Sequence, residues 1–253
     1  MTRPVPPAPA DETLPDKVET WPHLIRVELL VALVCMIVLV VWSIVVDAPL
    51  ESPANPNRTP DPSKAPWYFV GLQEILVYFD PWIAGVMVPG FIIVGLMLIP
   101  YIDPNPAGNG YYTWRQRRFA ISTFLFGFLG LWILPILIGV FCRGPGWAWY
   151  WPWESWEVPH THLMPSKNLS DLLGVPDGLP AFALGAVAVL GWYALGYLFY
   201  RWKRERIREI GLDGWRYAVV AFLMLSMMAI PLKIALRLAL DLKYVWVTPW
   251  FNI

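Results

Sequence analysis

The residues best suited to chemistry lie together in one polar, proline-rich connection between two long apolar runs. The connection combines a proline, three consecutive aromatic residues and a carboxylate: Pro66, Trp67, Tyr68, Phe69 and Glu74. A carboxylate near a tyrosine hydroxyl suits proton transfer, because its surroundings can tune its pKa toward the working pH. These five residues are therefore the first candidates for a functional site.

The spacing of apolar residues in this connection predicts a short helix that starts at Pro66. Proline favours a first helical turn because its missing N–H would have no partner there. One apolar face follows at i, i+4, i+7 and i+11, formed by Tyr68, Leu72, Ile75 and Phe79. The run ends at Asp80-Pro81. It is too short to cross a bilayer, so it should lie in the interface or pack on neighbouring helices. In the plainer interpretation the aromatic residues only anchor the chain at the membrane surface, and Glu74 pairs with a neighbour or faces the interface.

Composition indicates a membrane protein. Hydrophobic residues make up 57% of the chain and charged residues only 15%, against about 25% charged in a typical soluble domain. The mean hydropathy is +0.48. The 16 tryptophans and 11 tyrosines gather near the ends of the apolar runs, as in the aromatic belts of membrane proteins. A net charge of +0 argues against nucleic acid as a partner, because nucleic-acid binding needs a basic excess.

Five apolar runs are long enough to cross a bilayer, for which about 20 residues are needed. The predicted spans are residues 24–46, 83–102, 119–141, 180–200, and a last run that begins near Trp215 and fades at Lys233 and Arg237. Pro89 and Pro135 fall inside the second and third spans and are predicted to kink them. The fold class is therefore all-α, a polytopic membrane protein with one additional interfacial helix.

The distribution of Lys and Arg predicts the orientation of these spans. The cations cluster in the connections 103–118 and 201–216, which the positive-inside rule assigns to the cytoplasm together with the N-terminus. The connections 47–82 and 142–179 and the C-terminus then face the outer side. We expect an integral protein of a bacterial inner membrane. Lys233 and Arg237 run against this trend, so they either reach the headgroups or contact a partner subunit.

Histidines and cysteines give weak signals. A bis-histidine haem within a membrane needs histidines inside spans, but His23 precedes the first predicted span, and His160 and His162 lie in the outer connection. We therefore expect no metal site and no haem ligated within the spans. A metal or a neighbour's haem at His160 and His162 is the less favoured alternative to a solvated loop. Cys35 is expected as a small apolar residue of the first span, and Cys142 has no partner in a Cys-x-x-Cys motif.

Four motifs occur in a characteristic order along residues 20–141. They are Trp21-Pro22, the run Leu50-Glu-Ser-Pro-Ala-Asn-Pro56 leading to Pro66-Trp-Tyr-Phe69, the run Ile99-Pro-Tyr-Ile-Asp103, and the run Arg117-Arg-Phe-Ala-Ile-Ser-Thr-Phe-Leu-Phe-Gly127. Together they resemble the C-terminal half of cytochrome b, which exists as a separate chain, subunit IV, in cytochrome b6f-type complexes. The resemblance ends near residue 141 and carries nothing over to residues 142–253.

The resemblance implies a subunit of a bc-type quinol:cytochrome c, or other acceptor, oxidoreductase. It implies that the chain forms part of the quinol oxidation site on the positive side of the membrane, with Pro66, Trp67, Tyr68 and Phe69 binding the quinol. It also implies a partner subunit, like the N-terminal half of cytochrome b, that carries haem b. A Rieske-type iron–sulfur protein or a cytochrome c would accept the other electron.

The chain departs from the family at the family's signature, Pro-Glu-Trp-Tyr. Aligned on Trp67 and Tyr68, the first two positions of that signature fall on Ala65 and Pro66, so the glutamate that would accept a quinol proton is missing. We predict that Glu74 replaces it as the proton acceptor, through water and Tyr68.

The predicted organisation is a disordered cytoplasmic tail (1–22), a cytochrome b C-terminal-like region (23–141), a Trp-rich outer loop (142–179) and two additional spans (180–253). The alternative function is a non-catalytic structural subunit of a respiratory or photosynthetic electron-transfer complex, which the missing glutamate supports. A transporter or channel would predict paired ionisable residues deep in the spans or an inverted repeat, and neither is visible.

Overall fold

The computed structural model describes residues 20–47, 53, 55–57, 59–107, 113–157 and 166–253. Most of the tail predicted to be disordered, together with His160 and His162, lies outside these residues. Five helices in the described part are long and apolar enough to cross a membrane, which confirms the prediction of an all-α polytopic membrane protein. The chain forms two compact units, Met1–Thr59 and Pro60–Ile253.

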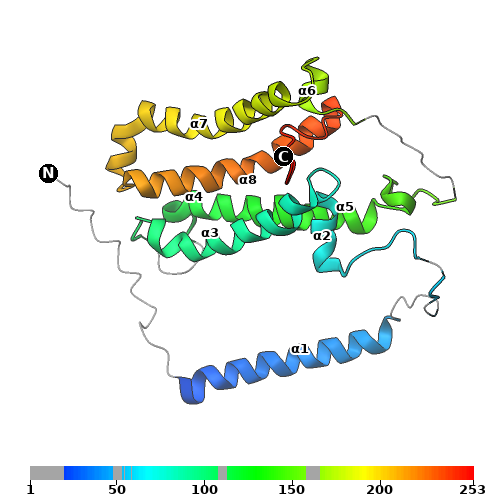
Figure 1. Cartoon of the computed structure of the whole chain (residues 1–253). Coiled ribbons are helices and arrows are strands. Elements are labelled where there is room, and N and C mark those ends of the chain that lie inside the picture. The colour runs from blue at the N-terminus through cyan, green and yellow to red at the C-terminus, as the bar shows by residue number, and fades with distance from the viewer. Residues whose placement is uncertain (1–19, 48–52, 54, 58, 108–112, 158–165) are drawn as a thin grey trace. The chain divides into compact units, whose positions relative to one another are not determined.

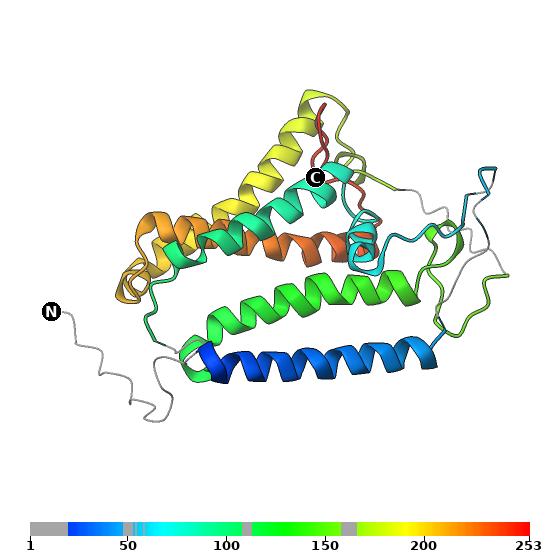
Figure 2. The same ribbon diagram turned by 90° about the horizontal axis from the view of Figure 1, so that it is seen from below.

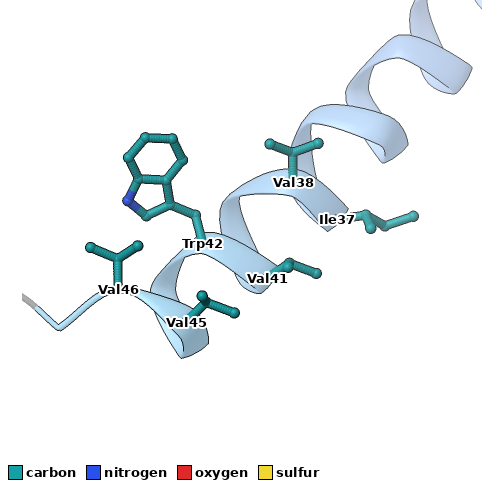
Figure 3. A pocket seen from close by; sticks show the side chains of 6 residues that line it. All are labelled: Ile37, Val38, Val41, Trp42, Val45 and Val46. Carbon is teal, nitrogen blue, oxygen red and sulfur yellow. The ribbon is translucent and has the colours of Figure 1, made fainter.

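In its described residues the first unit contains one long helix, α1 (Ile25–Val45), preceded by one π-helical turn, Thr20–Leu24. His23 lies in this π-helical turn and so within the span Thr20–Val45, which corrects the prediction that it precedes the first span. No residue of α1 is buried. Its surface has a shallow hollow (Figure 3) bounded only by apolar side chains: Ile37, Val38, Val41, Trp42, Val45 and Val46. A hollow with this lining offers no group that could take up a proton.

The described part of the second unit holds four of the five candidate spans and two short α-helices; Figures 1 and 2 show the arrangement of these helices. Its second span, Ile83–Ile102, has the predicted bounds, whereas the other three are longer than predicted because polar residues extend the helices beyond the apolar runs. The α-helical elements are α2 (Trp67–Ile75), α3 (Val88–Ile102), α4 (Trp114–Leu125), α5 (Leu134–Phe141), α6 (Leu169–Leu172), α7 (Leu179–Glu209) and α8 (Gly214–Leu240).

The two prolines that were predicted to kink their spans, Pro89 and Pro135, each follow a π-helical stretch. Ile83–Met87 lies just before Pro89 and Phe126–Ile133 just before Pro135, and each proline stands in the first turn of the α-helix that follows. A proline lacks the N–H of a regular turn and its ring clashes with the carbonyl four residues earlier. A local change to π-helical hydrogen bonding relieves this conflict without ending the span.

The spans of the second unit alternate in direction, and α8 packs against both α7 and α3. At one end the residues that follow α3 and α7 meet, where a Cβ on Gly211 would lie 3.4 Å from the Cβ of Pro104. The two cation-rich regions therefore share one end, as the charge pattern predicted. The cations from 201 to 208 lie on the last turns of α7 and not in a loop, because Lys, Arg and Glu are good helix formers.

At the opposite end, α2 lies across α5. Two glycines allow the close approach: a Cβ on Gly139 would lie 2.3 Å from Val70 Cγ1, and one on Gly71 would lie 2.9 Å from Ile136 Cγ1. The face of α2 buried by this contact consists of Val70, Gly71, Glu74 and Ile75. Tyr68, which was predicted to belong to the apolar packing face, is exposed instead.

Candidate functional site

The carboxylate of Glu74 is buried at the contact between α2 and the end of α5, with 1% of the residue exposed. Arg143, which follows α5 directly, donates from Nε to Glu74 Oε2 at 2.8 Å and from Nη2 to Oε1 at 2.6 Å. This is a two-pronged, charge-assisted contact, the strongest type of hydrogen bonding between side chains. Arg143 is itself buried, so the pair is almost completely shielded from solvent.

Two further donors complete the surroundings of the Glu74 carboxylate. The hydroxyl of Tyr78 donates to Oε1 at 2.9 Å and the indole Nε1 of Trp147 donates to Oε2 at 3.2 Å. Trp147 reaches this position from a tight turn in which it and Gly146 both have positive φ, 55° and 64°. A bulky residue in this left-handed conformation is strained, and the turn is held by the Arg143 Nη1 bond to the Trp147 carbonyl at 3.1 Å. We call Glu74, Tyr78, Arg143 and Trp147 the carboxylate cluster.

The electrostatics of the carboxylate cluster favour a charged Arg143 and a neutral Tyr78. Burial alone lowers the pKa of Arg143, but hydrogen bonds to Glu74 and its negative charge outweigh burial, so the pKa is raised overall. Burial, followed by the charge of Glu74, raises the pKa of Tyr78 to about 12. The tyrosine hydroxyl therefore keeps its proton and remains a donor to the carboxylate through the physiological pH range.

The segment that leads into α2 is also held in position by hydrogen bonds. The side chain of Gln73 accepts from Ala65 N at 3.0 Å and donates to the Ser63 carbonyl at 2.8 Å. Lys64 donates to the Val140 carbonyl at the end of α5 at 2.7 Å, and burial lowers its pKa. Asp61 accepts from Gly146 N at 2.7 Å. The residues before the aromatic trio are thus bonded to α2, α5 and the Trp147 turn.

The predicted quinol-binding residues lie on the exposed face at the start of α2. Trp67, Tyr68 and Phe69 are 66%, 46% and 52% exposed, and Pro66 stands directly before the helix. Their rings contact one another, with centroids 5.6 Å apart for Trp67–Tyr68 and 4.8 Å for Tyr68–Phe69. We call these three residues the aromatic ledge. It offers a continuous apolar surface backed by a helix whose other face is packed.

The sequence brought Tyr68 and Glu74 together as one site, but the structure gives them different surroundings. Tyr68 is exposed on the aromatic ledge, whereas Glu74 points into the carboxylate cluster. No described hydrogen bond joins the two side chains. Helix α2 therefore has an exposed face that carries the aromatic ledge and a buried face that contributes Glu74 to the carboxylate cluster.

Sequence reasoning missed Arg143, Trp147 and Tyr78 as members of this site. Arg143 carried a usable signal, since it follows a span on the side that is otherwise poor in Lys and Arg. A carboxylate on the packed face of a short helix requires a cation, because an unpaired buried charge is very costly. Arg143 meets that need from a position distant in the sequence.

The described residues contain no group of three or more metal-ligating side chains. Of the histidines, the structure describes His23, which is exposed in the first turn preceding α1. A haem with two histidine ligands does not fit the described spans of this chain, because a second histidine is lacking there.

Comparison with known proteins identifies part of the chain. Residues 53–138 match the family model described as cytochrome b(C-terminal)/b6/petD. This segment is therefore similar to the C-terminal half of cytochrome b, as its motifs predicted. The match indicates a cytochrome b-type subunit of a bc- or b6f-type complex, with a cytochrome b partner and haem b in that complex. The chain has no match among curated proteins and none among solved structures.

The cytochrome b C-terminal segment contains the aromatic ledge and Glu74, but not all of the elements that hold them. Arg143 and Trp147 follow the matched residues, as do α7 and α8. Two of the four members of the carboxylate cluster therefore come from outside the family segment.

The raised pKa of Tyr78 predicts a specific dependence of stability on pH. A tyrosine whose folded pKa lies above its unfolded value of about 10 stabilises the fold fully below pH 10, and this contribution is lost as pH rises toward the folded pKa of about 12. We expect the thermal midpoint of the detergent-solubilised protein to fall over this interval, and Tyr78→Phe to remove that part of the fall. Melting curves at pH 8 to 12 test this, with Tyr101→Phe, an exposed tyrosine, as the control. Equal pH profiles for wild type and Tyr78→Phe would contradict it.

Proposed function

We propose that this chain is a membrane subunit of a bc-type quinol:acceptor oxidoreductase and forms part of its quinol oxidation site. The observation that carries the proposal is the aromatic ledge. Three exposed rings in mutual contact lie within the cytochrome b C-terminal segment, at the end of the spans, on a helix fixed by buried contacts. Aromatic faces on a rigid support suit a flat quinone ring, because little side-chain freedom is lost on binding.

In this proposal catalysis is divided among subunits. Pro66 and the aromatic ledge bind the quinol and orient it, while the haem-bearing partner takes one electron and a Rieske-type iron–sulfur protein or cytochrome c takes the other. Electron transfer itself belongs to those cofactors. The ledge faces the outer, positive side of a bacterial inner membrane, and the N-terminus is cytoplasmic.

Glu74 has two possible roles. As the proton acceptor it would have to release Arg143, because both carboxylate oxygens already accept hydrogen bonds from the carboxylate cluster. As a permanent partner of Arg143 it would instead fix α2, and with it the aromatic ledge, against α5. The first role, with Tyr68 as the relay, is still a prediction; the contacts favour the second.

A tyrosine substitution tests the proposed site. In the native complex, purified through a tag on this chain, we expect Tyr68→Ala to raise the KM for a quinol analogue about tenfold, equivalent to about 1.4 kcal/mol of lost binding. The measurement is quinol-dependent reduction of haem b and of the external acceptor.

The matched control is Tyr101→Ala, which removes an exposed tyrosine at the opposite end of the spans (66% exposed). It should leave the KM unchanged. If Tyr68→Ala and Tyr101→Ala gave the same KM as the wild type, the aromatic ledge would not be part of the quinol site.

The second candidate function is a structural subunit whose degenerate site does not turn over quinol. Its support is the complete pairing of Glu74, together with the lack of an acid at Ala65-Pro66. A complex in which a quinol-site inhibitor fails to protect the aromatic ledge from chemical labelling would favour this candidate.

A further inference from the structure

Lys233 is a buried cation within a membrane-spanning helix. It lies in α8 with 5% of the residue exposed. Its ammonium group donates to three backbone carbonyls, those of Tyr78 at 3.2 Å, Leu242 at 3.2 Å and Lys243 at 2.5 Å. Lys233 was predicted either to reach the lipid headgroups or to contact a partner subunit. The structure corrects this prediction, because its ammonium group is bonded within its own chain.

These three carbonyls need the donors that Lys233 supplies. Tyr78 lies beyond the end of α2, and Leu242 and Lys243 lie beyond the end of α8, where carbonyls lack helical partners. An ammonium group has three N–H donors and can satisfy three such acceptors at once. Lys233 thus joins the turn after α2 to the segment after α8.

Other contacts from the C-terminal region reach the same turn. Ile230 and Ile234, on either side of Lys233, pack against the cluster of Ile75, Tyr78, Phe79 and Ala84. From the last residues of the chain, Asn252 Nδ2 donates to Asp80 Oδ2 at 3.3 Å. The end of α2 is therefore held by α8 from one side and by the C-terminal segment from the other.

We propose that Lys233 is a positioning residue for the quinol site: it fixes the end of α2 and thereby the orientation of the aromatic ledge. The inference rests on the proposed function for the identity of the ligand. Tyr78 connects the two regions, because its carbonyl accepts from Lys233 while its hydroxyl donates to Glu74. Lys233 and Asn252 both lie outside the cytochrome b C-terminal segment, so α8 and the C-terminal residues of this chain act as a brace that holds that segment in place.

Two variants and two readouts test the brace. Lys233→Met removes all three donors while nearly keeping the length of the side chain, and Lys233→Arg keeps a donating cation. In the native complex we expect Lys233→Met to increase the rate of amide hydrogen exchange in residues 75–80 about ten- to a hundredfold. We expect the KM for a quinol analogue to rise about tenfold with kcat nearly unchanged, and Lys233→Arg to restore most of both.

The control is Lys203→Met, which removes a lysine from the far end of α7 and should change neither readout. If Lys233→Met prevents assembly, Asn252→Ala loosens the same turn more gently and should move both readouts in the same direction. Unchanged exchange in residues 75–80 in both variants would overturn the brace. Faster exchange in a complex that oxidises no quinol would retain the brace and overturn the proposed function instead.

Discussion

Replacing Arg143 by methionine is expected to destabilise this protein more than any other single side-chain change in the described part of the chain. Glu74 would stay buried and lose its two bonds to the guanidinium group. Removing one partner of a buried ion pair leaves an uncompensated charge and costs about 3–5 kcal/mol. We expect the complex carrying Arg143→Met to assemble poorly and to melt at a much lower temperature. Melting curves and the yield of assembled complex measure this.

The double variant Glu74→Gln with Arg143→Met separates the charge pair from proton transfer. It removes both charges, so most of the lost stability should return. If assembly returns together with quinol turnover, Glu74 is not the proton acceptor. If assembly returns but turnover stays about a hundredfold or more below that of the wild type, a general-base role for Glu74 is supported.

The control for this prediction is Arg216→Met. Arg216 lies 3.8 Å from Asp213 in an ion pair at the helix end, where the Asp213 side chain is largely exposed. Exposed pairs contribute at most about 1 kcal/mol, so its melting temperature should stay close to that of the wild type. A melting temperature of Arg143→Met equal to that of Arg216→Met would contradict the assignment of a buried, stabilising pair.

Gly139→Ala is expected to displace α2 from α5. The new Cβ would lie 2.3 Å from Val70 Cγ1 and 3.3 Å from the Val70 carbonyl oxygen. Val70 is fully buried, and a β-branched residue in a helix has a single favoured rotamer, so it cannot turn aside. Overpacking of this kind costs about 1–3 kcal/mol. Because α2 carries both the aromatic ledge and Glu74, we expect lower stability and reduced quinol turnover together.

A compensating substitution makes this prediction specific. Val70→Ala removes the methyl group that Gly139→Ala would strike, so the double variant should recover much of the stability and turnover. Gly90→Ala is the control, because a Cβ there meets nothing within 4 Å. The thermal midpoints and the turnover of the wild type, Gly139→Ala, the double variant and Gly90→Ala test this prediction. A Gly139→Ala variant as stable and active as Gly90→Ala would show that α2 tolerates a wider separation from α5.

The parts of the fold that were predictable from the sequence are those set by local properties. The second span was predicted with its correct bounds, because apolar length alone decides whether a helix can cross a bilayer. The extension of α7 past the membrane was missed, since hydropathy marks the end of the apolar run and not the end of the helix. The order of the motifs likewise indicated the cytochrome b C-terminal family, and the comparison confirmed that resemblance for residues 53–138.

The site was only half predictable, for a reason that Glu74 illustrates. Its position in the sequence placed it on the predicted short helix that starts at Pro66, but did not show whether it faces a pocket or a neighbouring helix. The partner that decides this, Arg143, lies 69 positions away. Lys233 shows the same limit more strongly, since the carbonyl of Tyr78 that accepts its hydrogen bond lies 155 positions away. From the sequence alone, a cation near the end of a span suggested contact with lipid headgroups or with a partner subunit.

The sequence by itself determined the membrane class, the order of the spans, the clustering of cations at one end, and the resemblance of residues 53–138 to the C-terminal half of cytochrome b. Each of these follows from composition, periodicity or a motif that is read along the chain. Tertiary structure alone decided that α2 has a closed face with a buried ion pair and an open face with the aromatic ledge. The physical reason is that burial of a charge depends on donors brought from distant segments, and no local pattern records which segments will meet.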